Sequence, residues 1–127
     1  MYSRRPALTA TTSDRQAPAP LTPAVFFILF ALADGEKHGY AIMQQAISLS
    51  ENTIRMGPGT LYSTLQRLLE QSLVEEVASP IDFGDDSRRR YYRLTKAGRI
   101  LLAAECERIE SLVRLARQKR LLARNAG

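Results

Sequence analysis

Two groups of residues have types and spacing that suit contact with an anion. Gly57–Gly59 and Thr60 precede a helical pattern, so the helix would begin on residues with little or no side chain. The free N–H groups at a helix N-terminus carry about half a positive charge and bind anions. Further along, Arg88–Arg90 form a run of three guanidinium groups, which grip phosphates through paired hydrogen bonds. Both groups therefore predict contact with phosphate.

Each group also has a simpler explanation. Gly57–Gly59 could form only a tight turn between two helices, and a run of arginines on its own is usually a solvated face. Contact is favoured because a backbone without side chains can approach a phosphate closely. Pro58 fits this interpretation, since the N–H that proline lacks has no intrahelical partner at that position.

The helix that follows is expected from Pro58 to Gln71 and has two different faces. Leu61, Leu65 and Leu68 recur at helical spacing and predict a buried side. The opposite side carries a hydroxyl, an amide and a guanidinium group, which can bind base edges or phosphates. We expect these side chains to contact DNA: Ser63, Gln66 and Arg67.

The remaining patterns predict the elements that position this helix. Thr22 and Pro23 form a helix start, and the apolar residues after them predict a core helix. Leu73–Ser79 and Arg88–Thr95 have strand composition and flank a loop, which predicts a hairpin. A second helix is expected from His38 to Leu49, with an inward side formed by Tyr40, Ile42, Met43, Ala46 and Ile47.

A last helix, capped by Thr95, is expected to reach Arg124. Its apolar residues recur at roughly heptad spacing, and one short domain cannot cover both sides of so long a helix. They predict the seam of a homodimer rather than a helix folded back on its own core. The expected interface residues are Leu101, Leu102, Ile109, Leu112, Val113 and Ala116.

The order of elements predicts a mainly α fold with a small β-hairpin. Three short helices followed by a hairpin form a winged helix-turn-helix, and a long C-terminal dimerisation helix follows it. We expect a flexible basic N-terminal arm over residues 1–20. The winged helix-turn-helix DNA-binding domain would cover residues 21–95, and the dimerisation helix residues 96–124.

Composition narrows the class of protein. The net charge of +5 and the pI of about 9.8 favour polyanionic partners, nucleic acid before a membrane surface. His38 and Cys106 have no spacing that suits a metal site or a nucleophilic pair, so we expect no enzyme activity, no metal and no cofactor. A single cysteine indicates a reducing cytoplasm, and no segment is apolar enough to span a membrane.

Three segments carry a family resemblance. HGYAI (38–42), GTLYSTLQRLLEQSLV (59–74) and RRRYYRLTKAG (88–98) resemble the PadR family of winged-helix transcriptional regulators. The resemblance covers residues 21–115, and the single long C-terminal helix resembles the short subclass. It implies a dimer, usually a repressor, and places Tyr40 and Tyr62 at signature positions near the DNA or the core. Ser72 departs from the family, which commonly has glycine before the strand.

Together these observations predict a sequence-specific DNA-binding transcriptional regulator, a repressor that binds a palindromic operator of double-stranded DNA as a homodimer. The alternative is a winged-helix protein-interaction module that does not bind DNA specifically. A small-molecule inducer is left open and unidentified. The expected DNA-binding residues are Tyr40, Pro58, Gly59, Thr60, Tyr62, Ser63, Gln66, Arg67, Arg88, Arg89 and Arg90.

Overall fold

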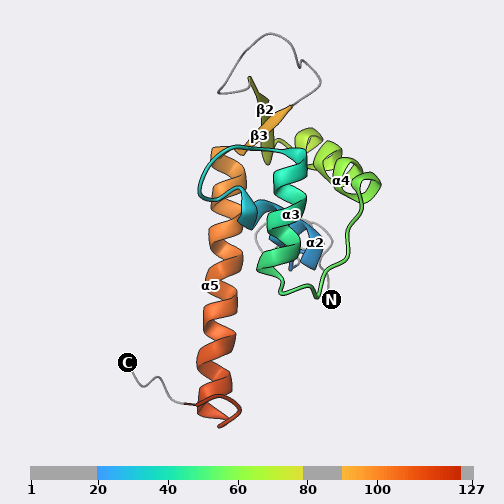
Figure 1. Cartoon of the computed structure of the whole chain (residues 1–127). Coiled ribbons are helices and arrows are strands. Elements are labelled where there is room, and N and C mark those ends of the chain that lie inside the picture. The colour runs from blue at the N-terminus through green and yellow to red at the C-terminus, as the bar shows by residue number, and fades with distance from the viewer. Residues whose placement is uncertain (1–19, 79–89, 124–127) are drawn as a thin grey trace, which may run out of the picture.

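The architecture joins short helices and a small sheet to one long helix. The computed structural model describes residues 20–78 and 90–123 (Figure 1). Within these residues the helices are α2 (Pro23–Ala31), α3 (Gly39–Leu49), α4 (Pro58–Glu70) and α5 (Lys96–Gln118). The strands are β1 (Lys37–His38), β2 (Val74–Val77) and β3 (Tyr91–Leu94). The C-terminal turns of α5 extend away from all the other elements (Figure 1). The predicted mainly α fold with a winged helix-turn-helix and a long last helix is confirmed.

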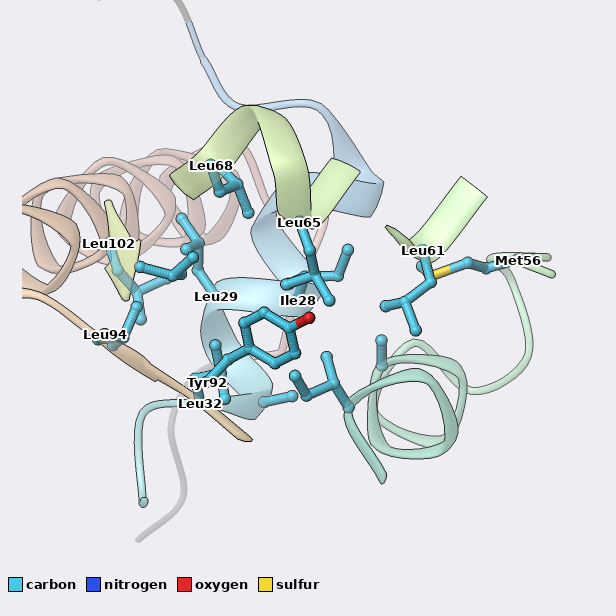
Figure 2. Close-up of a cluster of buried hydrophobic side chains, with 14 residues drawn as sticks. Ile28, Leu29, Leu32, Met56, Leu61, Leu65, Leu68, Tyr92, Leu94 and Leu102 are labelled. Carbon is cyan, nitrogen blue, oxygen red and sulfur yellow. The ribbon is translucent and has the colours of Figure 1, made fainter. Parts of the chain in front are cut away.

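The core forms around α2, which packs mainly against α3 and also contacts α5. The Thr22 hydroxyl accepts a hydrogen bond from the Val25 N–H at 3.3 Å, so α2 begins at the predicted cap. From α2, Ile28 is completely buried. Leu65 of α4 lies beside it, and residues of β3 and α5 close the cluster (Figure 2). The predicted inward leucines of α4 are all buried: Leu61, Leu65 and Leu68.

The sheet has a strand that the sequence did not reveal. The strand order is β1-β3-β2, and both pairs are antiparallel. Lys37 pairs with Tyr92 and His38 with Tyr91, which adds β1 to the predicted hairpin. Two residues are too few to show the alternation typical of a strand, so only the long-range pairing defines β1. The expected loop at 80–87 lies outside the described residues.

The inward side of α3 differs from the prediction at one residue. Ile42 and Ala46 are completely buried, and Met43 and Ile47 are partly buried. Tyr40, in contrast, is 57% exposed. It precedes Ile42 by two residues, which is more than half a helical turn, so Tyr40 points away from the core. The helix starts at His38, whose Nδ1 accepts a hydrogen bond from the Ala41 N–H at 3.3 Å.

Three elements meet where α4 ends. Ser72 follows α4 in the left-handed region with φ 62°, and the Leu73 N–H donates to the Leu68 carbonyl at 2.9 Å. Glycine adopts this conformation without steric cost, which explains the family preference at position 72. The Thr95 hydroxyl then donates to the Ser72 carbonyl at 2.7 Å and accepts from the Gly98 N–H at 3.0 Å. One side chain thus links the end of α4 to the start of α5.

The predicted end of α5 is wrong. The helix stops at Gln118, six residues before Arg124, and is 23 residues or about 35 Å long. Arg120 adopts the left-handed conformation with φ 64°, and the Leu121 N–H donates to the Ala116 carbonyl at 2.8 Å, which closes the last turn. The sequence hid this stop because arginine rarely terminates a helix in this way and Leu121 continues the apolar pattern.

Gly98 is required by the packing of α5 on the α4–β2 connection. A Cβ at this position would overlap the Leu73 carbonyl oxygen, which belongs to the backbone and cannot rotate away. We therefore expect Gly98→Ala to lower the free energy of unfolding by roughly 1–3 kcal/mol or more in urea titrations. Ala97→Gly, at the exposed neighbouring position, should cost about 1 kcal/mol at most. Equal losses from the two changes would contradict this account.

Candidate nucleic-acid interface

The N-terminal end of α4 is open. Gly57, Pro58, Gly59 and Thr60 are all exposed, and no side chain of the described residues caps the helix. The Leu61 N–H donates to the Gly57 carbonyl at 3.0 Å, so the N–H groups before it have no partner within the helix. They point out of the helix end, where an anion can accept their hydrogen bonds.

The two glycines at this end are not required by the described fold. Gly57 has φ −96° and ψ 177°, an extended conformation that any residue adopts, and Gly59 is inside the helix. A Cβ built on either would meet no atom within 4 Å. Gly39 differs, because a Cβ there would overlap the hydroxyl end of Tyr62. The turn between α3 and α4 therefore gives no reason for glycine at 57 or 59.

The outer face of α4 carries the predicted polar side chains. Ser63, Gln66 and Arg67 are exposed, while the leucines face the core. The Ser63 hydroxyl donates to the Thr60 carbonyl at 3.2 Å, a bond that it can exchange by rotation. The Gln66 amide donates to the Glu70 carboxylate at 3.4 Å, so a negative charge also lies on this face.

Tyr62 connects the start of α4 to the start of α3. Its ring lies against Gly39, and it is 48% exposed. The exposed Tyr40 follows Gly39 directly, so the two predicted tyrosines lie near each other on neighbouring helices. Burial raises the pKa of the Tyr92 phenol, and the nearby Glu76 and Tyr62 raise it further. α4 also contacts the sheet directly, through β2.

The described part of the wing presents one of its three predicted arginines. The Arg90 side chain is exposed, and its guanidinium lies 3.0 Å from the Glu76 carboxylate. Arg88 and Arg89 lie outside the described residues, as do residues 1–19 of the arm expected over residues 1–20. Sequence reasoning did not anticipate the Glu76 partner, because strand register decides which side chains meet.

A basic residue near the α4 start was also missed. Arg55 is exposed and precedes Gly57 by two residues, at the end of the connection from α3. Its position next to the glycines was the signal that could have identified it. Arg55 and Arg67 place positive charge at the start and on the outer face of α4.

The apolar surface of α5 differs in part from the predicted seam. Leu102 is only 5% exposed and belongs to the core, because the first turns of α5 pack on the rest of the chain. Ile109 and Leu112 are exposed, as is Leu115, which the sequence analysis did not include. The other three predicted seam residues are partly buried within the chain: Leu101, Val113 and Ala116.

The described residues do not gather the groups that catalysis by a metal would need. His38 caps α3, and its ring packs edge-to-face on Tyr91 with centroids 5.6 Å apart. Cys106 is partly buried against the core. Over residues 20–78 and 90–123, no three His, Cys, Asp or Glu side chains are arranged to hold a metal ion. In the same ranges, no helix has the length and apolar character to cross a membrane.

Solved structures share this architecture. The chain superposes with a TM-score of 0.62 on a PadR family transcription regulator from Clostridium difficile, at 24% identity, covering 76% of this chain and 97% of the other. A transcriptional regulator from Clostridium thermocellum gives a TM-score of 0.57 at 25% identity, covering 74% and 89%. The shared fold is therefore that of winged-helix regulators.

Curated sequences and a family model agree with the fold. The chain is 39% identical over 87 residues to the transcriptional regulator Rv3488 of Mycobacterium tuberculosis, covering 68% of this chain and 76% of that protein. It is 40% identical over 89 residues to an uncharacterized 37.1 kDa protein in transposon TN4556 of Streptomyces fradiae, covering 70% of this chain but only 24% of that protein. The model of the transcriptional regulator PadR-like family matches residues 28–104. The chain belongs to the PadR-like family of transcriptional regulators.

Proposed function

We propose that this regulator binds a palindromic operator in double-stranded DNA as a homodimer and represses transcription from it. The observation that carries the proposal is the open end of α4, where Gly57 and Gly59 leave space that the described fold does not use. Within a helix, alanine is more stable than glycine by about 1 kcal/mol, so glycine at 59 costs stability. Contact with a DNA phosphate or groove edge in this space would contribute binding free energy that offsets this cost.

The outer face of α4 supplies the contacts that read sequence. Gln66 can form two hydrogen bonds with an adenine, and Ser63 can bond with several base edges once its hydroxyl rotates. Arg67 reaches a guanine or a phosphate. Arg55 and Arg90 then contact the sugar-phosphate backbone on the two sides of α4 and set its position in the groove. Among the remaining predicted contacts are Tyr40, Pro58, Thr60, Tyr62, Arg88 and Arg89.

A second copy of the chain completes the site. Ile109, Leu112 and Leu115 expose apolar surface on turns of α5 that extend beyond the rest of the chain (Figure 1). Pairing of two such helices would bury this surface. We assign residues 21–95 to DNA binding and residues 96–124 to dimerisation, with Leu102 anchoring α5 to its own core. Two-fold symmetry then places half-sites about 34 Å apart or a multiple of that distance.

A change at Gly59 separates the effect on folding from the effect on DNA binding. Gly59→Ala should raise the free energy of unfolding by about 0.5–1 kcal/mol, because alanine favours the helix. It should weaken binding to a fragment of the protein's own promoter by tenfold or more, because the added methyl group occupies the phosphate position. Urea unfolding and fluorescence anisotropy measure the two effects. Gln71→Ala, at the exposed far end of α4, is the control and should leave binding unchanged.

Unchanged binding by Gly59→Ala would remove the main support for the proposal. A wild-type protein that shows no salt-sensitive, sequence-selective binding would instead favour the protein-interaction module. In contrast, contacts with six to ten phosphates predict a loss of affinity of about 10³- to 10⁵-fold between 50 and 200 mM salt.

The next prediction distinguishes reading of bases from contact with the backbone. Gln66→Ala should change the preferred base at one operator position and cost about 1–3 kcal/mol there. Arg90→Ala should weaken binding to all sequences alike and reduce the dependence on salt. Selection of bound sequences from random DNA, followed by titrations at several salt concentrations, measures both. Equal, sequence-independent losses from the two variants would reject the assigned roles.

The dimer has its own test. Leu112 is 51% exposed in the single chain, so a charged residue there should not disturb the core. We expect Leu112→Glu to raise the dimer dissociation constant at least tenfold, because it places a carboxylate in the apolar seam, as measured by analytical ultracentrifugation. Glu110→Gln, on an exposed position nearby, should leave the dimer intact. A Leu112→Glu protein that remains dimeric would place the interface elsewhere.

A further inference from the structure

The two adjacent glutamates of β2 lie on opposite faces of the sheet. Val74 pairs with Leu94 and Glu76 with Tyr92, and Val74, Leu94 and Tyr92 are all buried. Because side chains alternate along a strand, Glu76 is on the same face as these buried residues. Glu75 is on the other face, where it pairs directly with Arg93.

The buried face of the sheet is the one that meets α4. Tyr92 belongs to the same core cluster as the leucines of α4 (Figure 2). Val74 is a member of this cluster as well. α4 also contacts β2, the strand that carries Glu76. Arg90 precedes Tyr92 by two residues and continues the same face toward the wing. Glu76 and Arg90 therefore lie on the side of the sheet that carries the candidate interface.

Each glutamate forms an ion pair with an arginine: Glu75 with Arg93 of β3, and Glu76 with Arg90, which directly precedes β3. The Arg90–Glu76 distance is 3.0 Å, with side chains 63% and 40% exposed. The Arg93–Glu75 distance is 2.7 Å, with side chains 52% and 46% exposed. The pairs are similar in exposure and composition and differ in the face on which they lie. Exposed pairs of this kind are weak, so a competing phosphate can replace the carboxylate.

We propose that Glu76 holds Arg90 in the free protein and thereby restrains DNA binding. When the wing approaches DNA, a phosphate displaces the Glu76 carboxylate from the Arg90 guanidinium, and the wing exchanges one anion for another. This inference rests on the DNA binding proposed above and deepens it, since it assigns a restraining role to an acidic residue. Glu75 has no such role, because its arginine lies on the other face.

A matched pair of variants tests the exchange. Glu76→Gln and Glu75→Gln each raise the net charge by one at adjacent residues, so a general effect of charge on DNA affinity is the same for both. Glu76→Gln should bind both operator and unrelated DNA roughly two- to fivefold more tightly than the wild type, as expected for loss of one exposed ion pair. Glu75→Gln should show only the general effect of the added charge and bind at most slightly more tightly than the wild type. Fluorescence anisotropy at fixed salt measures both, with circular dichroism to compare folding.

A double-mutant cycle tests whether the gain in DNA affinity from Glu76→Gln depends on Arg90. In an Arg90→Ala background, Glu76→Gln should give no further gain, because the residue that it releases is absent. A gain that persists without Arg90, or that Glu75→Gln reproduces, would overturn the restraint while leaving DNA binding in place. Failure of the wild type to bind any DNA would instead overturn the proposed function, and this inference with it. The two failures are thus distinguishable.

Discussion

The hydrogen bonds of the Thr95 hydroxyl join the end of α4 to the start of α5, and the arrangement of the other elements depends on this junction. It donates to the carbonyl that follows α4 and accepts from the Gly98 N–H in the first turn of α5. Since Gly98 has no side chain, α5 packs directly on the Leu73 carbonyl. The end of α4, the base of the hairpin and the start of α5 are therefore fixed to one another. In a dimer, this connection would set how the two α4 helices are spaced.

This arrangement anchors α4 at one end and along one side. Its C-terminal end is closed by the left-handed Ser72 and the junction at Thr95, and its leucines are buried. The N-terminal end, at Gly57–Thr60, is left exposed. A Cβ at Gly39 or Gly98 would overlap atoms of the same chain. A Cβ at Gly57 or Gly59 would meet no atom of the described residues within 4 Å. Of these four, only Gly98 meets backbone, so it is the glycine that the packing of the chain requires, whereas Gly57 and Gly59 are available to a partner.

The charges of the interface are less one-sided than the basic composition suggests. Glu70 lies beside Gln66 on α4, and Glu76 pairs with Arg90 on the wing. Acidic groups near a DNA-binding face lower affinity for DNA of every sequence, so contacts that read bases gain relative importance. For the operator binding proposed above, this balance favours specificity over affinity.

The sequence by itself determined the features that depend on neighbouring residues. The caps at Thr22 and Thr95, the leucine face of α4 and the order of the helices and the hairpin follow from local hydrogen bonding and apolar periodicity. Family membership could also be predicted from short motifs. The stop at Gln118 is a local feature, but a left-handed arginine is too rare to be predicted there. Only the tertiary structure decided the third strand β1 and the burial of Leu102. The same holds for the partner of Arg90. Strand pairing and core packing join residues far apart in the chain, and no local pattern records which of them meet.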